Sequence, residues 1–198
     1  GKAVDELSNL DRNYLDSVYT QYMSSTQVPG IAIGILKNGN ILYSKGFGIK
    51  NKDTKEPVTS KSLFHLASVS KTFEATAIMQ LSQEEKLELD DPIVKYLPYF
   101  EMKDKRYKAI TIKQILTHSS GIPDVRDYQW DKPEYGDDAL ENYVRTFKKK
   151  KLDFEPGQQF QYSNAAFEVL GDLIAKVSDM AFEDYIQKNI LRPVQMEN

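Results

Sequence analysis

Cysteine is absent from this sequence of 198 residues, and histidine occurs only twice. Without cysteine, the protein can form no disulfide, no thiolate nucleophile and no Cys-ligated metal site. The two histidines, His65 and His118, are far apart in the sequence, so a histidine-based metal site is a poor prospect. We therefore expect no metal and no other cofactor. Any chemistry must depend on hydroxyls, amines, carboxylates and amides.

The sequence also lacks an excess of positive charge and a long apolar run. Its 26 basic and 29 acidic residues leave a formal charge of -3, so we expect no nucleic-acid partner. No apolar stretch approaches the roughly eighteen residues that a membrane helix needs. The first residues contain no signal-peptide core. Because the chain begins with Gly1 and not with Met, a signal or anchor could have been removed before this point. A hydrophobic share of 40% suits one sizeable core, and we treat residues 1–198 as one domain.

Hydrophobic patterning predicts a helix, a β-hairpin and then a mostly helical region, an α/β (α+β) arrangement. Apolar residues at helical spacing predict a helix over 5–26, and two β-rich runs around Asn38, Gly39 and Asn40 predict a hairpin. These elements form a part at 5–60, and a mostly helical part follows at 61–198. Its expected helices lie within 68–85, 110–124, 138–150, 165–180 and 181–194. A lone hairpin is only marginally stable, so it must pack on a helix, or further strands are missing.

Two details of the helical region are further expectations. The helix over 68–85 is apolar on nearly all sides, which predicts that it is buried. The four consecutive lysines at 148–151 are typical of a solvated helix end.

Ser68 and Lys71 form a Ser-x-x-Lys motif at the start of the helix over 68–85. Unpaired N–H groups and the positive end of the helix dipole would stabilise an alkoxide or oxyanion there. Lys71 projects from the same face within hydrogen-bond reach of the serine. Burial of the lysine amine would disfavour its charged form and lower its pKa, so that Lys71 could act as a base. The alternative is that Ser68 is an ordinary N-cap and Lys71 reaches solvent. About one such motif is expected by chance in this composition.

Tyr162 and Asn164 form a second candidate group, in the Tyr-Ser-Asn that precedes a buried helix. A phenol beside a lysine ammonium can lose its proton below its free pKa of about 10, so Tyr162 could exchange a proton with the serine or a leaving group. The Asn164 amide could hydrogen-bond both Lys71 and a substrate carbonyl. The alternative is a core tyrosine with a satisfied hydroxyl, followed by a helix-capping asparagine.

Six segments, taken in order, resemble the serine β-lactamase and penicillin-binding protein superfamily. They are most similar to its class C β-lactamase, D-alanyl-D-alanine carboxypeptidase and esterase branch. The resemblance covers roughly residues 12–198 and implies a β-lactamase/transpeptidase-like fold whose antiparallel sheet is incomplete in this chain. The segments are GIAIGILKNGNILYSKGFG, FHLASVSKTFEATAIMQL, KLELDDPIVKYLP, ITIKQILTHSSGIPD, FEPGQQFQYSN and GDLIAKVSDMAFEDYIQKNILRPVQM.

The resemblance also implies roles for the candidate residues. Ser68 would be the acylated nucleophile, and its backbone N–H would be half of the oxyanion hole. Lys71 would be its partner in proton transfer, and Tyr162 the general base or acid. Asn164 would be the substrate-facing amide that also holds Lys71. Which of Lys71 and Tyr162 takes the serine proton stays open, because two coupled groups can titrate as a unit.

His65 and His118 are further candidate bases, because both lie in or beside these segments. The family does not use them so, and a lone histidine near a turn is more often a hydrogen-bonded structural residue. We expect Ser70 and Ser120 to hydrogen-bond locally as well.

The predicted function is therefore that of a serine acyl-transfer hydrolase working through a Ser68 acyl-enzyme. Its substrate would be a small molecule or peptide: a β-lactam, a D-alanyl peptide or an ester. The alternative is a non-catalytic module that keeps the fold and binds cell-wall peptide or a partner protein. The resemblance implies an extracytoplasmic location: periplasmic, secreted or cell-surface.

The family's third motif, a Lys-Thr-Gly or His-x-Gly on a strand, does not occur before Asn198. The chain therefore looks like the first half to two-thirds of the domain. It could be an excised piece, a proteolytic remainder or a short form that another chain completes. Losing one oxyanion donor costs about a hundredfold in turnover, so we expect these residues alone to hydrolyse poorly. An exposed sheet edge would favour self-association.

Overall fold

The computed structural model describes residues 7–128 and 131–196. They form two compact units, and the boundary between the units falls between His65 and Leu66. This boundary is close to the predicted division between 60 and 61. The two units are described separately.

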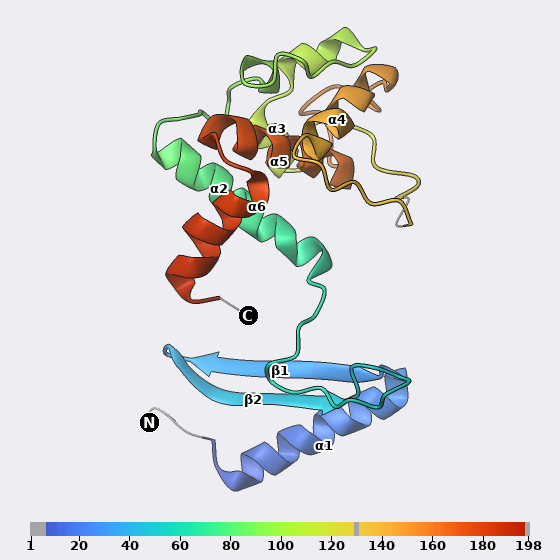
Figure 1. Cartoon of the computed structure of the whole chain (residues 1–198), viewed down its shortest axis with the longest axis vertical. Coiled ribbons are helices and arrows are strands. Elements are labelled where there is room, and N and C mark those ends of the chain that lie inside the picture. The colour runs from blue at the N-terminus through green and yellow to red at the C-terminus, as the bar shows by residue number, and fades with distance from the viewer. Residues whose placement is uncertain (1–6, 129–130, 197–198) are drawn as a thin grey trace. The chain divides into compact units, whose positions relative to one another are not determined.

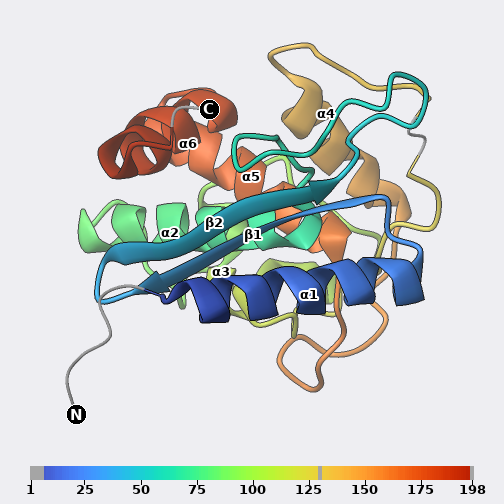
Figure 2. The same cartoon turned by 90° about the horizontal axis from the view of Figure 1, so that it is seen from below.

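The first unit is a helix that lies along a two-stranded antiparallel hairpin (Figures 1 and 2). Its elements are α1 (Asn9–Thr26), β1 (Gly30–Lys37) and β2 (Asn40–Gly48). A capping box starts α1, because Ser8 Oγ accepts from the backbone N–H of Asp11 and the Asp11 carboxylate accepts from that of Ser8. The predicted helix and hairpin are therefore confirmed.

Local turn chemistry and one carboxylate hold the first unit together. Asn38 and Gly39 both have positive φ, +51° and +78°, which suits the tight turn of a hairpin. Asp16 of α1 accepts hydrogen bonds from the Tyr43 hydroxyl at 2.5 Å and from Lys45 Nζ at 2.6 Å, both on β2. The hairpin therefore packs on a helix, which is one of the two arrangements that the sequence analysis considered.

The second unit contains the remaining elements, in which all the predicted helices appear. They are a 3₁₀ helix at Ala67–Val69, α2 (Ser70–Gln83), α3 (Ile112–Leu116), α4 (Ala139–Arg145), α5 (Asn164–Ser178) and α6 (Phe182–Ile186), with further 3₁₀ turns at Ile93–Lys95, Lys105–Ala109, Thr146–Lys149 and Arg192–Val194 and a π-helical turn at Gln187–Leu191. Within the ranges that the structure describes, no helix is both long enough and apolar enough to span a membrane.

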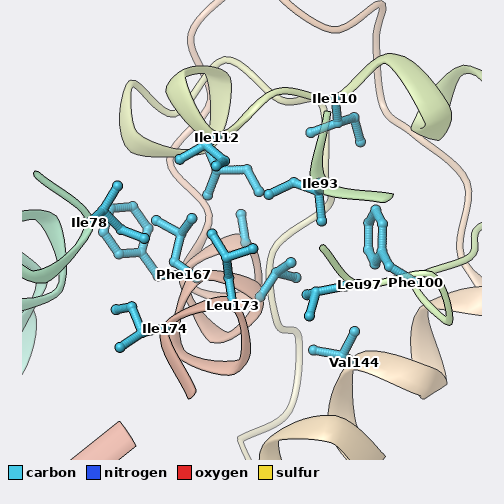
Figure 3. Close-up of a cluster of buried hydrophobic side chains, with 14 of the residues drawn as sticks. Ile78, Ile93, Leu97, Phe100, Ile110, Ile112, Val144, Phe167, Leu173 and Ile174 are labelled. Atoms are coloured by element: carbon cyan, nitrogen blue, oxygen red, sulfur yellow. The ribbon is translucent and has the colours of Figure 1, made fainter. Parts of the chain in front are cut away.

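The core of the second unit surrounds α5, which contacts α2, α3, α4 and α6. Figure 3 shows Phe167, Leu173 and Ile174 of α5 among side chains from the other elements. Complete burial of one such side chain stabilises the fold by about 1.5–3 kcal/mol. The others labelled there, all buried, are Ile78, Ile93, Leu97, Phe100, Ile110, Ile112 and Val144. This packing makes α5 a firm support for the residues at its amino-terminal end.

One sequence expectation about this unit, the burial of the helix over 68–85, is wrong. Of the residues of α2, only Ala77, Ile78 and Leu81 are buried, while Met79 is 51% exposed. Within this unit α2 packs one face against α5 and α6, so an apolar composition did not mean burial on all sides.

Lys150 departs from the expected solvated lysine run. It is half-buried, and its Nζ lies 4.6 Å from the centre of the Phe147 ring. Burial lowers the pKa of Lys150, and the Asp124 carboxylate opposes that change. Lys150 differs from the lysines before it because the 3₁₀ helix ends at Lys149 and the backbone is extended at Lys150.

Candidate active site

Ser68 lies in the 3₁₀ helix that leads into α2, directly after a residue with an unusual backbone conformation. Ala67 has φ of +47°, in the left-handed region that a side chain with Cβ rarely adopts. Such strain costs on the order of 1–3 kcal/mol and tends to occur at functional sites. No side-chain hydrogen bond caps this 3₁₀ helix or α2 within the described residues, where Val69 is the N-cap position of α2. The alternative reading of Ser68 as an ordinary N-cap is therefore wrong.

Tyr162 reaches Ser68 from a segment 94 residues further along the chain. Its hydroxyl donates a hydrogen bond of 2.7 Å to Ser68 Oγ. The tyrosine is 39% exposed, so it is not the core aromatic of the alternative reading. Burial opposes ionisation of the phenol, but its interactions with Lys71 and Ser68 outweigh burial, and the pKa of Tyr162 lies below its usual value of 10.0. The phenol is thus primed to exchange a proton with Ser68.

Lys71 is half-buried between Asn164 and two aromatic rings. Its Nζ donates a hydrogen bond of 2.6 Å to Asn164 Oδ1. The same nitrogen lies 5.1 Å from the centre of the Tyr162 ring and 5.3 Å from that of Phe167. The expected direct hydrogen bond from Lys71 to Ser68 is not seen in the part of the chain that the structure describes. Tyr162, which contacts both residues, stands between them.

Asn164 is the first residue of α5, and it does not cap the helix. Ser163 is the cap, because its Oγ accepts from the backbone N–H of Ala166 at 3.1 Å. The Asn164 side chain instead donates from Nδ2 to Asp124 Oδ2 at 3.2 Å and to the Tyr128 hydroxyl at 2.6 Å. Both N–H groups of the amide are therefore directed at protein oxygens. That Asn164 also faces a substrate stays a prediction.

His118 supports Tyr162 and does not contact Ser68 through any hydrogen bond among the described residues. Its Nδ1 accepts from the backbone N–H of Ser163 at 3.2 Å, and its ring centre lies 4.3 Å from that of Tyr162. Burial and the charge of Lys71 lower the pKa of His118, and Asp124 opposes them. A neutral imidazole that accepts at Nδ1 agrees with the structural role expected for it.

Of the other sequence candidates, Ser120 takes the expected local role, whereas no hydrogen bond of the His65 side chain is seen among the described residues. His65 is exposed and belongs to the first unit. Ser120 is buried, and its Oγ accepts from the backbone N–H of Ile122 at 3.2 Å, which is the local hydrogen bond expected of it.

Two chain segments are hydrogen-bonded side by side and so place His118 against Tyr162. The carbonyls of His118, Ser119 and Gly121 accept from the backbone N–H groups of 161, 157 and 153 at 2.8, 2.7 and 2.9 Å. Gly121 has φ of +75°, and a Cβ added there would lie 2.5 Å from the Phe154 carbonyl oxygen. A glycine is therefore needed at this close approach. The Ser-Gly and Pro-Gly turn signals of the sequence lie in these two segments.

Glu74 is a half-buried acid near the site that sequence reasoning missed. It follows Lys71 by one helical turn, and its Oε2 is buried and has no hydrogen-bond partner among the described residues. Burial raises the pKa of Glu74 to about 8; the charge of Glu168 adds to the shift, and that of Lys71 opposes it. The sequence signal that could have identified Glu74 is an acidic residue within an otherwise apolar stretch of helix.

The described residues contain no group of three or more histidine or acidic side chains that could hold a metal ion. The arrangement offers an exposed serine hydroxyl, a phenol hydrogen-bonded to it and a neighbouring lysine amine group.

Comparison with known proteins agrees with these features. Residues 15–198 match the family model for β-lactamases. Protein flp of Staphylococcus aureus (strain MW2) is 32% identical over 97% of this chain and 39% of its own length. The octameric penicillin-binding protein homologue of Pyrococcus abyssi has a TM-score of 0.81 and 34% identity, over 94% of this chain and 44% of its own. The D-alanine carboxypeptidase AmpC of Burkholderia cenocepacia has a TM-score of 0.77 and 30% identity, over 96% of this chain and 50% of its own.

The chain thus spans about two-fifths of the length of the curated relatives that it matches. Its helices and two-stranded antiparallel sheet correspond to part of the β-lactamase/transpeptidase fold. The chain belongs to the β-lactamase family, as its ordered motifs predicted.

Proposed function

We propose that this protein is a serine acyl-transfer hydrolase that works through an acyl-enzyme at Ser68. The observation that carries the proposal is the hydrogen bond of 2.7 Å between Tyr162 and Ser68, with Lys71 beside the tyrosine ring. A weak oxygen nucleophile needs a neighbouring base and a group that stabilises the base's charge, and these side chains offer both.

In the proposed reaction, Ser68 Oγ loses its proton to Tyr162 or Lys71 and attacks the substrate carbonyl carbon. The carbonyl oxygen becomes an oxyanion, for which the backbone N–H of Ser68 is the proposed donor. The same proton then passes to the leaving nitrogen or oxygen as the bond to the carbonyl carbon breaks. Water hydrolyses the acyl-serine and restores the hydroxyl. Tyr162 donates to Ser68 in the structure, so it must first release its own proton to solvent before it can act as the base. Lys71 must likewise be a neutral amine to take the serine proton.

The proposed substrates are β-lactams, D-alanyl peptides and esters. The similarity to a D-alanine carboxypeptidase and to a class C β-lactamase in complex with cefoxitin supports the first two classes. All three contain an acyl carbon that a serine can attack. On family membership alone, we also propose an extracytoplasmic location, which fractionation of the source cells would test.

The proposed function is tested by labelling the 198-residue chain with a fluorophosphonate and locating the adduct by mass spectrometry. This reagent reports the reactivity of the nucleophile and makes few demands on the rest of a substrate site. We expect one adduct at Ser68, lost in Ser68→Ala. The matched control is Ser70→Ala, since Ser70 is an exposed serine in the same turn and its loss should leave labelling unchanged.

An adduct that persists in Ser68→Ala would refute the proposal. A wild-type chain that binds a penicillin reversibly but forms no adduct with either reagent would favour the non-catalytic binding module instead.

A separate proposal concerns self-association through the hairpin. The sheet formed by the described residues has only two strands, so each has one edge without a strand partner in that sheet. We expect sedimentation velocity to show a mass that rises with concentration. A monomer of 22.7 kDa at all concentrations would refute this.

A further inference from the structure

The two ends of the Asn164 side-chain amide have opposite hydrogen-bonding character. Its oxygen only accepts, its nitrogen only donates, and a lysine ammonium also only donates. The contact of 2.6 Å with Lys71 therefore requires the oxygen to face the lysine. Rotation by 180° about the terminal torsion would place two donors together, and that torsion has broad, roughly two-fold preferences. Lys71 thus favours the oxygen end, and the group at the other end of the amide either reinforces or opposes that orientation.

Asp124 is that group, because an ionised carboxylate can only accept. Its Oδ1 accepts from the backbone N–H of Asn164 at 2.7 Å and from that of Ala165 at 3.3 Å. Its Oδ2 accepts from Asn164 Nδ2 at 3.2 Å. The backbone hydrogen bonds place the carboxylate at the positive, amino-terminal end of α5, where a negative charge is favoured. From there it can receive only the nitrogen end of the amide.

Capping of α5 accounts for the Oδ1 contacts of Asp124 but not for the contact of its Oδ2 with the Asn164 amide. Ser163 already caps the helix through Ala166, and that hydrogen bond does not involve Asp124. The second N–H of the Asn164 amide is directed at the Tyr128 hydroxyl, which can accept or donate and so imposes no orientation by itself. The carboxylate of Asp124 is thus the acceptor that selects the orientation.

We propose that Asp124 is a positioning residue that fixes the Asn164 amide with its oxygen toward Lys71. The lysine ammonium is thereby held beside the Tyr162 ring, next to the tyrosine–serine hydrogen bond. The consequence for catalysis rests on the proposed function, whereas the orientation of the amide does not.

The discriminating variant is Asp124→Asn, which keeps the shape of the side chain but changes its hydrogen-bonding character. In this variant the side-chain oxygen at position 124 can still accept from the backbone N–H groups of α5. Its NH₂ group, a donor, then takes the place of Oδ2 and faces Asn164 Nδ2. Either orientation of the Asn164 amide then sets two donors together, at position 124 or at Lys71, so the amide should populate both orientations and hold Lys71 less firmly. We expect Ser68 labelling by a fluorophosphonate to slow about tenfold to a hundredfold, the scale of a misplaced catalytic group.

Two further variants separate positioning from general stability. Asp172→Asn neutralises a buried carboxylate elsewhere on α5, where it accepts from the Tyr99 hydroxyl at 2.7 Å, and should not slow labelling of the folded protein. The double variant Asp124→Asn with Asn164→Asp restores a donor–acceptor pair and an acceptor toward Lys71. It should recover part of the labelling rate lost in the single variant.

A readout independent of activity is the nuclear Overhauser effect of the Asn164 side-chain amide protons in the wild-type 198-residue chain. We expect cross-peaks to the Tyr128 ring and none to the ε-methylene of Lys71. In Asp124→Asn part of the cross-peak intensity should move to Lys71. Amide protons next to Lys71 in the wild type, or an unchanged orientation and labelling rate in folded Asp124→Asn, would overturn the proposal. If the wild type shows the expected cross-peaks but no labelling, the proposed function fails and the positioning stands.

Discussion

The hydroxyl of Tyr162 donates a hydrogen bond of 2.7 Å to Ser68 Oγ across 94 residues of sequence. Tyr162→Phe removes this hydrogen bond but keeps the ring that packs on His118. Loss of a general acid or base costs about a hundredfold or more, so we expect Ser68 labelling to fall by at least that factor. Thermal unfolding should be nearly unchanged, because the side chain is 39% exposed.

The matched control for this substitution is Tyr135→Phe, at a tyrosine that is 89% exposed. Labelling of that variant should equal the wild-type rate. Equal rates for Tyr162→Phe and the wild type would show that the phenol takes no part in activating Ser68.

The neighbouring lysine should control the pH dependence of Tyr162. Burial raises the pKa of the phenol, and the interactions with Lys71 and Ser68 bring it below 10.0. Lys71→Met removes the positive charge that lowers the pKa of Tyr162. The effect of burial, which raises this pKa, is then less compensated, so the pKa of Tyr162 should rise. The increase of the labelling rate with pH should therefore shift to higher pH than in the wild type.

An ultraviolet titration of the phenolate band, with Tyr162→Phe subtracted, measures the same change directly. Lys113→Met, at an exposed lysine of the same unit, is the control and should leave the titration of Tyr162 in place. An unchanged pKa of Tyr162 in Lys71→Met would show that Lys71 does not cause the lowered pKa.

Glu74 should make the protein less stable as the pH rises. Its pKa is about 8 in the folded protein against an ordinary value of 4.5, so the folded state binds more protons than the unfolded state between these values. Stability attributable to this group is complete below about pH 4.5 and is lost as the pH rises toward 8. Glu74→Gln should raise the free energy of unfolding at pH 7 by about 2–3 kcal/mol.

Urea denaturation at pH 5, 7 and 8 checks this prediction, with exposed Glu101→Gln as the control. The gain from Glu74→Gln should be smallest at pH 5. A gain that does not depend on pH would mean that the carboxyl is not the titrating group.

Gly121 should tolerate no side chain. A Cβ at this position would lie 2.5 Å from the Phe154 carbonyl oxygen, and φ of +75° strains any other residue. We expect Gly121→Ala to lower the free energy of unfolding by about 1–3 kcal/mol. Gly34→Ala meets its nearest atom at 3.9 Å and should change stability by less than about 0.5 kcal/mol. Urea denaturation of the two variants compares them, and equal stabilities would contradict the steric explanation.

Sequence reasoning succeeded where the signal was local. The Asn38–Gly39 turn sets the hairpin, and periodic apolar residues set the helices, because both depend on neighbours a few positions away. The candidate residues Ser68 and Tyr162 came from short motifs of chance frequency, which gained meaning only through their order in a known family. The burial of α2 was overestimated because composition does not say which neighbours cover a helix.

The sequence by itself determined the elements, the family and the four polar side chains that the structure brings together. Only the tertiary structure decided how these side chains bond. Asp124 lies 40 residues before Asn164 in the chain, and its contact with the amide selects the end that faces Lys71. Hydrogen-bond direction depends on which acceptor lies opposite which donor in space, and spacing along a chain does not encode that.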